Sequence, residues 1–159
     1  KINELRSQRF LGANVTIPHK VAVLDLLDEV DRVAEMIGSV NTILNREGYL
    51  LGYNTDTTGL IRSLKDHGNF SLEAENVLII GAGGASRAAV FALLNEGVAS
   101  VVIANRTWEK ASRLASELDE EFNVRAIPFC YKELSLNARE SEIIINCSSI
   151  KLFPIENLN

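Results

Sequence analysis

The chain has 159 residues, with 16 Lys and Arg against 21 Asp and Glu, a formal net charge of −5, and 47% hydrophobic residues. This composition argues against a wholly disordered chain, no apolar run is long enough to span a membrane, and the negative charge argues against nucleic acid as a partner. Cys130 and Cys147 lack a nearby His, which indicates neither a metal site nor a disulfide framework and favours the cytoplasm. Because the chain begins at Lys1 without Met and ends at Asn159 in mid-pattern, we expect a piece of a longer protein.

The first half predicts a helix followed by a β-hairpin. Apolar residues recur at helical spacing over residues 18–37, and Gly38 is a typical terminator. Val40–Leu44 and Tyr49–Tyr53 have the composition of paired strands, and the four residues 45–48 would form the turn between them.

A second helix is predicted from Asp56 to Gly68, and a polar stretch, Gly68–Asn76, follows it. We expect a domain boundary in this stretch, because the pattern of the chain changes after it. The boundary divides the chain into residues 1–67 and residues 68–159.

After the boundary, short apolar strands alternate with helices. The strands are almost continuously apolar, as strands buried on both faces are, and the alternation predicts right-handed βαβ units in a parallel sheet. The predicted strands are Val77–Ile80, Val101–Ala104, Val124–Pro128 and Ile143–Asn146, and the predicted helices are Ala85–Glu96 and Trp108–Glu121. A complete dinucleotide-binding domain often has about six strands. The fold class is therefore α/β, an incomplete doubly wound (Rossmann-like) parallel sheet domain preceded by a smaller α+β portion.

A glycine-rich turn joins the first of these strands to its helix. In this context Gly81 permits the tight turn, Gly83 lets a pyrophosphate approach the backbone, and small Ser86 allows close packing of helix on strand. The N–H groups at the start of the helix would bind the phosphates. The pattern favours a nucleotide site, and a glycine-rich connection without a ligand is the alternative.

The residues after the second strand indicate which dinucleotide binds. Sites for NAD usually place Asp or Glu there, whereas this chain has Asn105, Arg106 and Thr107, with Lys110 one turn later. An acid would repel a 2′-phosphate, while Arg106 can bind it through two parallel hydrogen bonds. We therefore predict NADP, with a solvated surface Arg and Lys as the alternative.

Lys20 has an unusual position for a lysine. On the predicted helix it projects to the apolar side with Val23 and Leu27, in a first turn where the macrodipole disfavours a cation. A partly buried amine is suited to proton transfer near neutral pH. A lysine that reaches past the edge of the core into water explains the same pattern equally well.

Asp56 lies between a strand and a helix, where Asp is a favoured N-cap. On such a rigid junction its carboxylate can also orient a substrate hydroxyl and share a proton with Lys20. Asn41 and Thr42 are further polar groups that we expect to face the same cleft. Cys147 ends the last strand without a nearby general base, so we assign it to the wall of the site and not to a nucleophile.

Five segments together resemble the shikimate dehydrogenase family. They are Asn14-Val15-Thr16-Ile17-Pro18-His19-Lys20, Ser39-Val40-Asn41-Thr42, Gly52-Tyr53-Asn54-Thr55-Asp56 with Gly59, Gly81-Ala82-Gly83-Gly84-Ala85, and Asn105-Arg106-Thr107. In the second segment Ser39 stands where the family pattern has Ala. The five motifs occur in the family's order over residues 14–107, which makes the resemblance specific.

The resemblance implies reversible, NADPH-dependent reduction of 3-dehydroshikimate to shikimate, on the pathway to chorismate and the aromatic amino acids. It makes Lys20 the acid/base residue and Asp56 its partner, while Asn14, Thr16 and Asn41 would hydrogen-bond substrate hydroxyls. The residues expected to bind NADP are Gly81, Ala82, Gly83, Gly84, Ala85, Asn105, Arg106, Thr107 and Lys110.

The resemblance also implies an organisation for the whole chain. Residues 1–67 would be part of a substrate-binding domain and residues 68–159 a C-terminally truncated NADP-binding domain, in a cytoplasmic monomer or homodimer. The family's N-terminal strand, whose Ser-x-Ser motif holds the substrate carboxylate, has no counterpart before Lys1, and its C-terminal Gln-bearing helix would lie beyond Asn159. A quinate or related cyclohexane-acid dehydrogenase, a non-catalytic NADP-binding module and an inactive fragment are therefore the alternatives.

Overall fold

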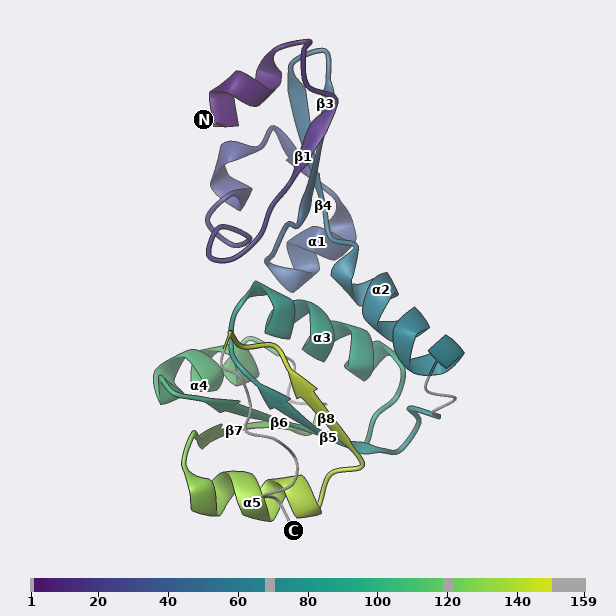
Figure 1. Ribbon diagram of the computed structural model, residues 1–159, viewed down its shortest axis with the longest axis vertical. Helices are drawn as coiled ribbons and strands as arrows, with labels where there is room; N and C mark the ends of the chain where they lie inside the picture. Colours follow the sequence, from purple (N-terminus) through teal and green to yellow (C-terminus); the bar gives the residue numbers. More distant parts are fainter. Residues whose placement is uncertain (1, 68–70, 119–121, 150–159) are drawn as a thin grey trace.

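Two four-stranded sheets, one in each half of the chain, organise the computed structural model, which describes residues 2–67, 71–118 and 122–149 (Figure 1). The sheet of the first half has the strand order β1-β3-β4-β2, and the sheet of the second half has the order β7-β6-β5-β8. The two sheets lie one above the other along the long axis of the molecule, with helix α3 between them (Figure 1).

The first sheet is mainly antiparallel. Its strands β1 (Gly12–Asn14), β3 (Thr42–Arg46) and β4 (Tyr49–Tyr53) pair in antiparallel fashion, and β2 (Glu29–Val30) pairs in parallel with β4. The short helices of this half are η1 (Ile2–Arg6), η2 (Leu24–Leu26) and α1 (Arg32–Ile37). Its core is a cluster of buried aliphatic side chains, Val23, Ala34, Val40, Ile43 and Leu50.

The predicted helix over residues 18–37 is wrong. Turns and the short η2 occupy most of this stretch, β2 interrupts it, and only α1 is regular α-helix. The backbone N–H of Asp31 bonds to the carbonyl of Gly52 at 2.8 Å, which holds the segment beside β4. The apolar residues of this stretch lie on separate segments but pack into one core. Their spacing along the sequence therefore resembled that of a helix. Gly38 does end α1, in the left-handed conformation with φ of 66°.

The predicted hairpin is confirmed, but its turn has two residues and not four. Glu47 and Gly48 form the turn with φ values of 54° and 94°, which matches a tight hairpin turn with two left-handed residues. Asn45 belongs to β3, where its buried side chain donates to the carbonyls of Leu5, Ser7 and Phe10 at 2.6, 3.0 and 2.8 Å. These bonds fasten the N-terminal loop to the sheet.

The second helix begins where it was predicted. It is α2 (Asp56–Arg62), which continues into a π-helical turn, η3 (Ser63–His67). Its inward residues Leu60, Ile61 and Leu64 pack against the core of the second sheet, as expected from their spacing. Gly68, the predicted end, lies outside the described residues.

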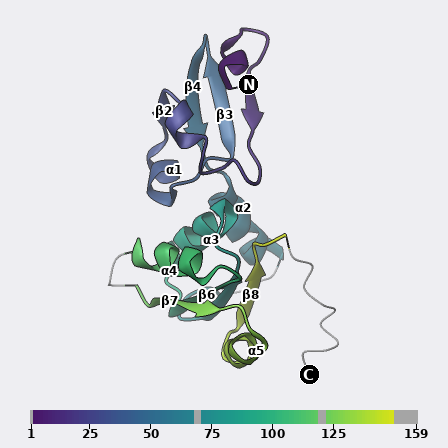
Figure 2. The ribbon, with the colours of Figure 1, turned by 90° about the vertical axis from the view of Figure 1, so that its left-hand side faces the viewer.

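The second sheet confirms the predicted parallel α/β fold. Its strands are β5 (Asn76–Ile80), β6 (Ser100–Asn105), β7 (Val124–Pro128) and β8 (Ile143–Asn146), all paired in parallel. Helices α3 (Gly84–Asn95) and α4 (Trp108–Ser116) cover one face, and α5 (Tyr131–Arg139) covers the other (Figure 2). This arrangement buries both faces of β5 and β6, which explains their continuous apolar sequences.

Several elements went unpredicted, among them the short helix η1, and one was predicted too long. The strands β1 and β2 and the helix α5 were missed, and α4 stops at Ser116 with Glu117 as its C-cap, whereas the prediction extended it to Glu121. Residues 119–121 lie outside the described residues. No helix in the described part of the chain is long and apolar enough to cross a membrane.

Candidate active site

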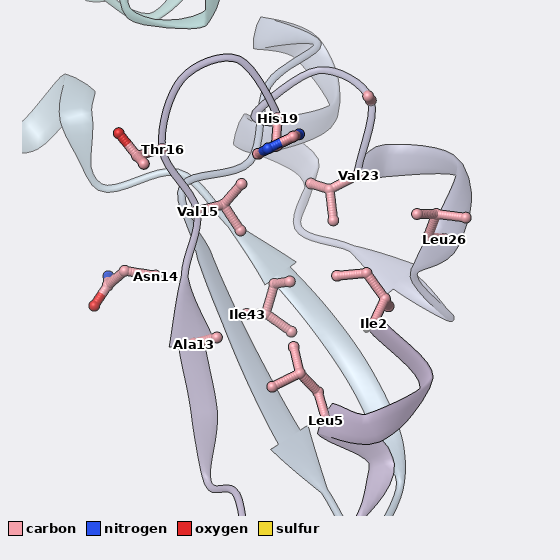
Figure 3. A pocket seen from close by; sticks show the side chains of 11 residues that line it. Ile2, Leu5, Ala13, Asn14, Val15, Thr16, His19, Val23, Leu26 and Ile43 are labelled. Atoms are coloured by element: carbon pink, nitrogen blue, oxygen red, sulfur yellow. The ribbon is translucent and has the colours of Figure 1, made fainter.

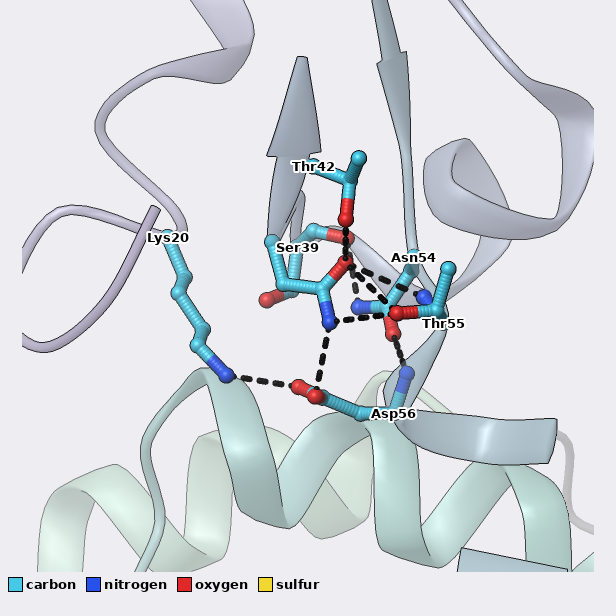
Figure 4. A network of polar contacts seen from close by, with 7 residues as sticks. Lys20, Ser39, Thr42, Asn54, Thr55 and Asp56 are labelled. Carbon is cyan, nitrogen blue, oxygen red and sulfur yellow. Dashed lines mark hydrogen bonds and ion pairs between the residues drawn. The ribbon is translucent and has the colours of Figure 1, made fainter. Parts of the chain in front are cut away.

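Lys20 and Asp56, both in the first half of the chain, form an ion pair next to the start of α2. The Lys20 Nζ donates to Asp56 Oδ2 at 2.6 Å, and only 13% of the lysine side chain is exposed, against 31% of the aspartate (Figure 4). Lys20 lies on a turn and not in the first turn of a helix, so the local structure predicted for it is wrong. Its carbonyl accepts from the N–H of Val40 at 2.8 Å, which ties this turn to the chain that leads into β3.

The Asp56 carboxylate is free of any capping role. Asp56 is the first residue of α2, and its own N–H donates to Asn54 Oδ1 at 3.0 Å. The buried Asn54 also donates to the carbonyl of Ser39 at 2.8 Å. The amide of Asn54 therefore orients the start of α2, and the carboxylate points across to Lys20 instead.

Asn41 holds the second oxygen of Asp56. Its Nδ2 donates to Asp56 Oδ1 at 2.7 Å and to Thr55 Oγ1 at 3.0 Å, and its Oδ1 accepts from the Thr42 hydroxyl at 2.8 Å and from the Thr55 N–H at 3.0 Å. Both hydrogens of the Asn41 amide are thus used within the protein. A role for Asn41 toward substrate hydroxyls stays a prediction.

Asn14 and Thr16 flank this network on the outer face of the first sheet. Asn14 pairs in register with Thr42, and Thr42 with Tyr53, so these three residues share one face. Figure 3 shows Asn14 and Thr16 pointing away from the apolar side chains Val15 and Ile43. Both residues are exposed, so their side chains are open to a ligand on that face.

An apolar cavity of about 340 Å³ lies beside β1 (Figure 3). Its walls come mainly from aliphatic side chains, which include Ile2, Leu5, Val15, Val23, Leu26 and Ile43. The polar residues Asn14, Thr16 and His19 also line it. It offers few polar groups to a hydroxylated acid and is separate from the ion pair.

The glycine-rich turn adjoins the ion pair through the start of α3. Gly81 has a φ of 116°, and a Cβ there would lie 3.1 Å from the carbonyl carbon of Cys147, so only glycine fits this turn. At Gly83 a Cβ would meet nothing within 4 Å, which leaves the backbone open to an approaching group. Ser86 is buried, as its predicted packing role requires, and its hydroxyl accepts from the Gly83 N–H at 3.3 Å.

The residues predicted to bind the 2′-phosphate lie beyond the carboxyl end of β6. Arg106, Thr107 and Lys110 are exposed, and neither cation takes part in the ion pairs found among the described residues. Asn105 Nδ2 donates to the carbonyl of Thr107 at 2.8 Å, which shapes the turn into α4. Both cations can therefore turn toward an anion.

Cys147 lies close to the same site. Burial raises the pKa of its thiol above the usual value, and the nearby Asp56 carboxylate adds to this, against a hydrogen bond from Ser86 and the charge of Lys20. The thiol is therefore protonated at neutral pH. Within the residues that the structure describes, no group of three His, Cys, Asp or Glu side chains could hold a metal ion.

Sequence reasoning missed the two residues that organise the ion pair. It allowed Asp56 an N-cap role, whereas Thr55 is the N-cap residue, without a side-chain capping bond, and Asn54 Oδ1 accepts from the N–H of Asp56. It gave no part to Thr55. The signal was present in the sequence, because Asn at a strand–helix junction is also a favoured cap. The bond from Asn54 to the Ser39 carbonyl joins two segments of the first half and had no local signal.

Known proteins resemble the chain in both halves. The family profile described as "Shikimate dehydrogenase substrate binding domain" matches residues 1–43, and the one described as "Shikimate / quinate 5-dehydrogenase" matches residues 63–158. The shikimate dehydrogenase (NADP(+)) of Geobacillus kaustophilus is 45% identical over 150 residues, which are 94% of this chain and 53% of that protein. The chain thus spans about half the length of the curated relatives it matches.

Solved structures give the same result. The shikimate 5-dehydrogenase of Thermus thermophilus, in complex with NADP(H) and shikimate, has a TM-score of 0.76 at 41% identity and matches 92% of this chain and 51% of that one. A quinate dehydrogenase from Corynebacterium glutamicum, in complex with NAD, has a TM-score of 0.79 at 28% identity, over 92% of this chain and 52% of that one.

Proposed function

Because the chain belongs to the shikimate/quinate 5-dehydrogenase family, we propose that it is part of an NADP-dependent enzyme that interconverts 3-dehydroshikimate and shikimate. The observation that carries the proposal is the Lys20–Asp56 ion pair, placed beside a glycine-rich turn at the carboxyl end of a parallel strand. Open α/β sheets bind their ligands at this edge. An ammonium group and a dinucleotide site thus lie close enough to act on one substrate.

The cofactor fits the residues present. Gly83 leaves its side of the turn open, the first N–H groups of α3 face the same space, and Arg106 and Lys110 are exposed where a 2′-phosphate would extend. The residues that we expect to hold NADP are Gly81, Ala82, Gly83, Gly84, Ala85, Asn105, Arg106, Thr107 and Lys110.

Lys20 and Asp56 have different roles in the reaction. Bound NADPH supplies the hydride for the ketone carbon. Lys20 donates a proton to the oxygen as negative charge develops there, and it takes that proton back in the reverse direction. Asp56 keeps the ammonium in place and accepts from a substrate hydroxyl, so its contribution is mainly one of position. Asn14, Thr16 and Asn41 lie where they can bind the remaining hydroxyls.

We also propose the domain organisation that the sequence indicates. Residues 1–67 contribute the substrate side and residues 68–159 the NADP side, with α2 packed on the core of the second sheet. Two free cysteines favour a reducing compartment such as the cytoplasm. A monomer or a homodimer is expected.

Replacing the lysine in the full-length protein tests the mechanism. Lys20→Ala should lower kcat by roughly 10²–10⁴-fold, because general acid–base catalysis is lost. NADPH affinity, measured by fluorescence titration, should stay nearly unchanged. Turnover equal to that of the wild type would refute the role of Lys20.

A quinate dehydrogenase is the second candidate, because a quinate dehydrogenase is among the structures that match. Spectrophotometric assays of NADP reduction with shikimate and with quinate, at equal concentrations, separate the two activities. NADPH binding without turnover of either acid would instead identify a non-catalytic binding module.

A further inference from the structure

Gly84, the first residue of α3, is the point where the glycine-rich turn touches the lysine segment. A Cβ added at Gly84 would lie 2.6 Å from Ser39 Oγ, 2.9 Å from Lys20 Cβ and 3.3 Å from Lys20 Cδ. Real Cβ atoms essentially never come within 3.0 Å of such neighbours. A side chain at position 84 would therefore displace the stem of the lysine, the serine or both.

The backbone conformation does not account for this glycine. Gly84 is part of an α-helix and is not one of the glycines with a positive φ, so alanine could adopt its backbone conformation. Glycine inside a helix is less stable than alanine. The benefit of glycine at position 84 must therefore come from what lies against it.

Lys20 is held at two places along its side chain. Asp56 binds its ammonium at 2.6 Å, and Gly84 lies against the carbons near its backbone. The four-carbon stem of lysine is flexible, and fixing its charged end requires support along the stem. The contact between Gly84 and the lysine stem directs the ammonium toward the carboxylate.

Ser39 completes this contact. It is fully buried, and its hydroxyl has no hydrogen-bond partner among the described residues. Because an unpaired buried hydroxyl is unfavourable, the Ser39 hydroxyl does not stabilise the fold through hydrogen bonding. It fills the space beside Gly84 and leaves no room for a side chain there.

The neighbouring glycine behaves differently. A Cβ at Gly83 would meet nothing within 4 Å, and the residue is exposed, so the missing side chain there leaves room for a ligand. Two adjacent glycines in one turn thus face different neighbours. We propose that Gly84 is a positioning residue for Lys20, and that its missing side chain sets where the ammonium stands while its N–H remains available to the cofactor.

Only the predicted loss of turnover rests on the proposed function. The direct test of the positioning role is the reactivity of the Lys20 amine toward an acylating reagent in the full-length protein, followed by mass spectrometry of the peptide that contains it. This measurement requires no activity. If the wild type labels Lys20 slowly but turns over neither acid, the proposed function fails and the positioning role is still tested.

Gly84→Ala should raise the labelling rate of Lys20 by about tenfold and lower kcat by about ten- to a hundredfold, because a displacement of about 1 Å has effects of this order. Any loss of NADPH affinity in Gly84→Ala should be smaller than the loss in Gly83→Ala, because the backbone N–H at position 84 is kept.

Two other glycines serve as controls. Gly59→Ala adds the same methyl group to exposed α2, where a Cβ would meet nothing within 4 Å, and should leave Lys20 labelling unchanged. Gly83→Ala should weaken NADPH by about tenfold or more, because the backbone must approach the pyrophosphate there, with Lys20 labelling as in the wild type.

The double variant Ser39→Gly/Gly84→Ala removes the nearest neighbour of the new methyl group and should restore part of the slow labelling. Wild-type labelling of Lys20 in folded Gly84→Ala would overturn the proposal. A loss of NADPH affinity equal to that of Gly83→Ala would also overturn it. If Gly84→Ala does not fold, Ser39→Thr crowds the same contact from the other side, and unchanged labelling there is equally decisive.

Discussion

Both oxygens of the Asp56 carboxylate are in use, one by the Lys20 ammonium and one by the Asn41 amide. A carboxylate oxygen accepts more than one hydrogen bond, so a substrate hydroxyl can join without displacing either partner. Under the proposed function, the carboxylate is therefore oriented before a substrate arrives, which is the condition for efficient positional catalysis.

Arg106 should determine the preference for NADP over NAD. In the full-length protein, Arg106→Leu should weaken NADPH by roughly 10- to 150-fold, because a charged hydrogen bond to the 2′-phosphate is lost. NADH lacks this phosphate and should bind as before. Fluorescence titrations with both cofactors measure the difference, and Arg139→Leu, on exposed α5 across the sheet, is the control. Equal losses for NADPH and NADH would contradict the assignment.

Asp28 should make the stability of the protein fall at acidic pH. The Arg6 guanidinium and the N–H of Leu50, which donates at 2.7 Å, lower the pKa of Asp28. Since the folded state holds this proton more weakly than the unfolded state, the stabilisation is complete above the usual carboxyl pKa and is lost as the pH falls through the lowered one. The urea midpoint should therefore decrease from about pH 6 to about pH 3, and Asp28→Asn should decrease less over this range. Parallel curves for the two proteins would exclude Asp28 as a source.

Among the secondary-structure elements, the hairpin of β3 and β4 contains one strained backbone position, Glu47, which a substitution can relieve. Glu47 adopts a φ of 54°, which is unfavourable for most side chains and tolerated by Asn. Glu47→Asn should therefore raise the free energy of unfolding by about 0.5–1 kcal/mol, as measured by urea denaturation. Glu47→Gln removes the charge but keeps the strain, so it should not reproduce the gain. A matching gain in Glu47→Gln would assign the effect to charge.

The sequence predicted the elements whose signals are local. The strands β5 and β6 are continuously apolar because both of their faces are buried, and the glycine-rich turn is bounded by a strand and a helix. Short β1 and β2 depend on pairing with β3 and β4, which are distant in sequence, so they had no local signal. The pairing of Lys20 with Asp56 followed from residue types, but the bond from Asn54 to the Ser39 carbonyl and the contact of Gly84 with Lys20 required the folded chain.

At the scale of the whole molecule, each sheet has its own buried core, so the two halves should lose stability separately. Asn45→Ala should destabilise the first half by about 2–4 kcal/mol, because several carbonyls of the N-terminal loop lose their partner. Native-state hydrogen exchange should then show faster exchange in β3 and β4 and unchanged exchange in β5 and β6. Exposed Asn95→Ala on α3 is the control. Equal acceleration in both sheets would show that the halves unfold as one unit.

Helix α2 begins at the ion pair and packs its inward residues on the core of the second sheet. Lys20, by contrast, is fastened through Val40 to the first sheet. Asp56 is bonded to Asn41 of the same half, so the ion pair is held within the first half, at the point where α2 leaves it for the core of the second sheet.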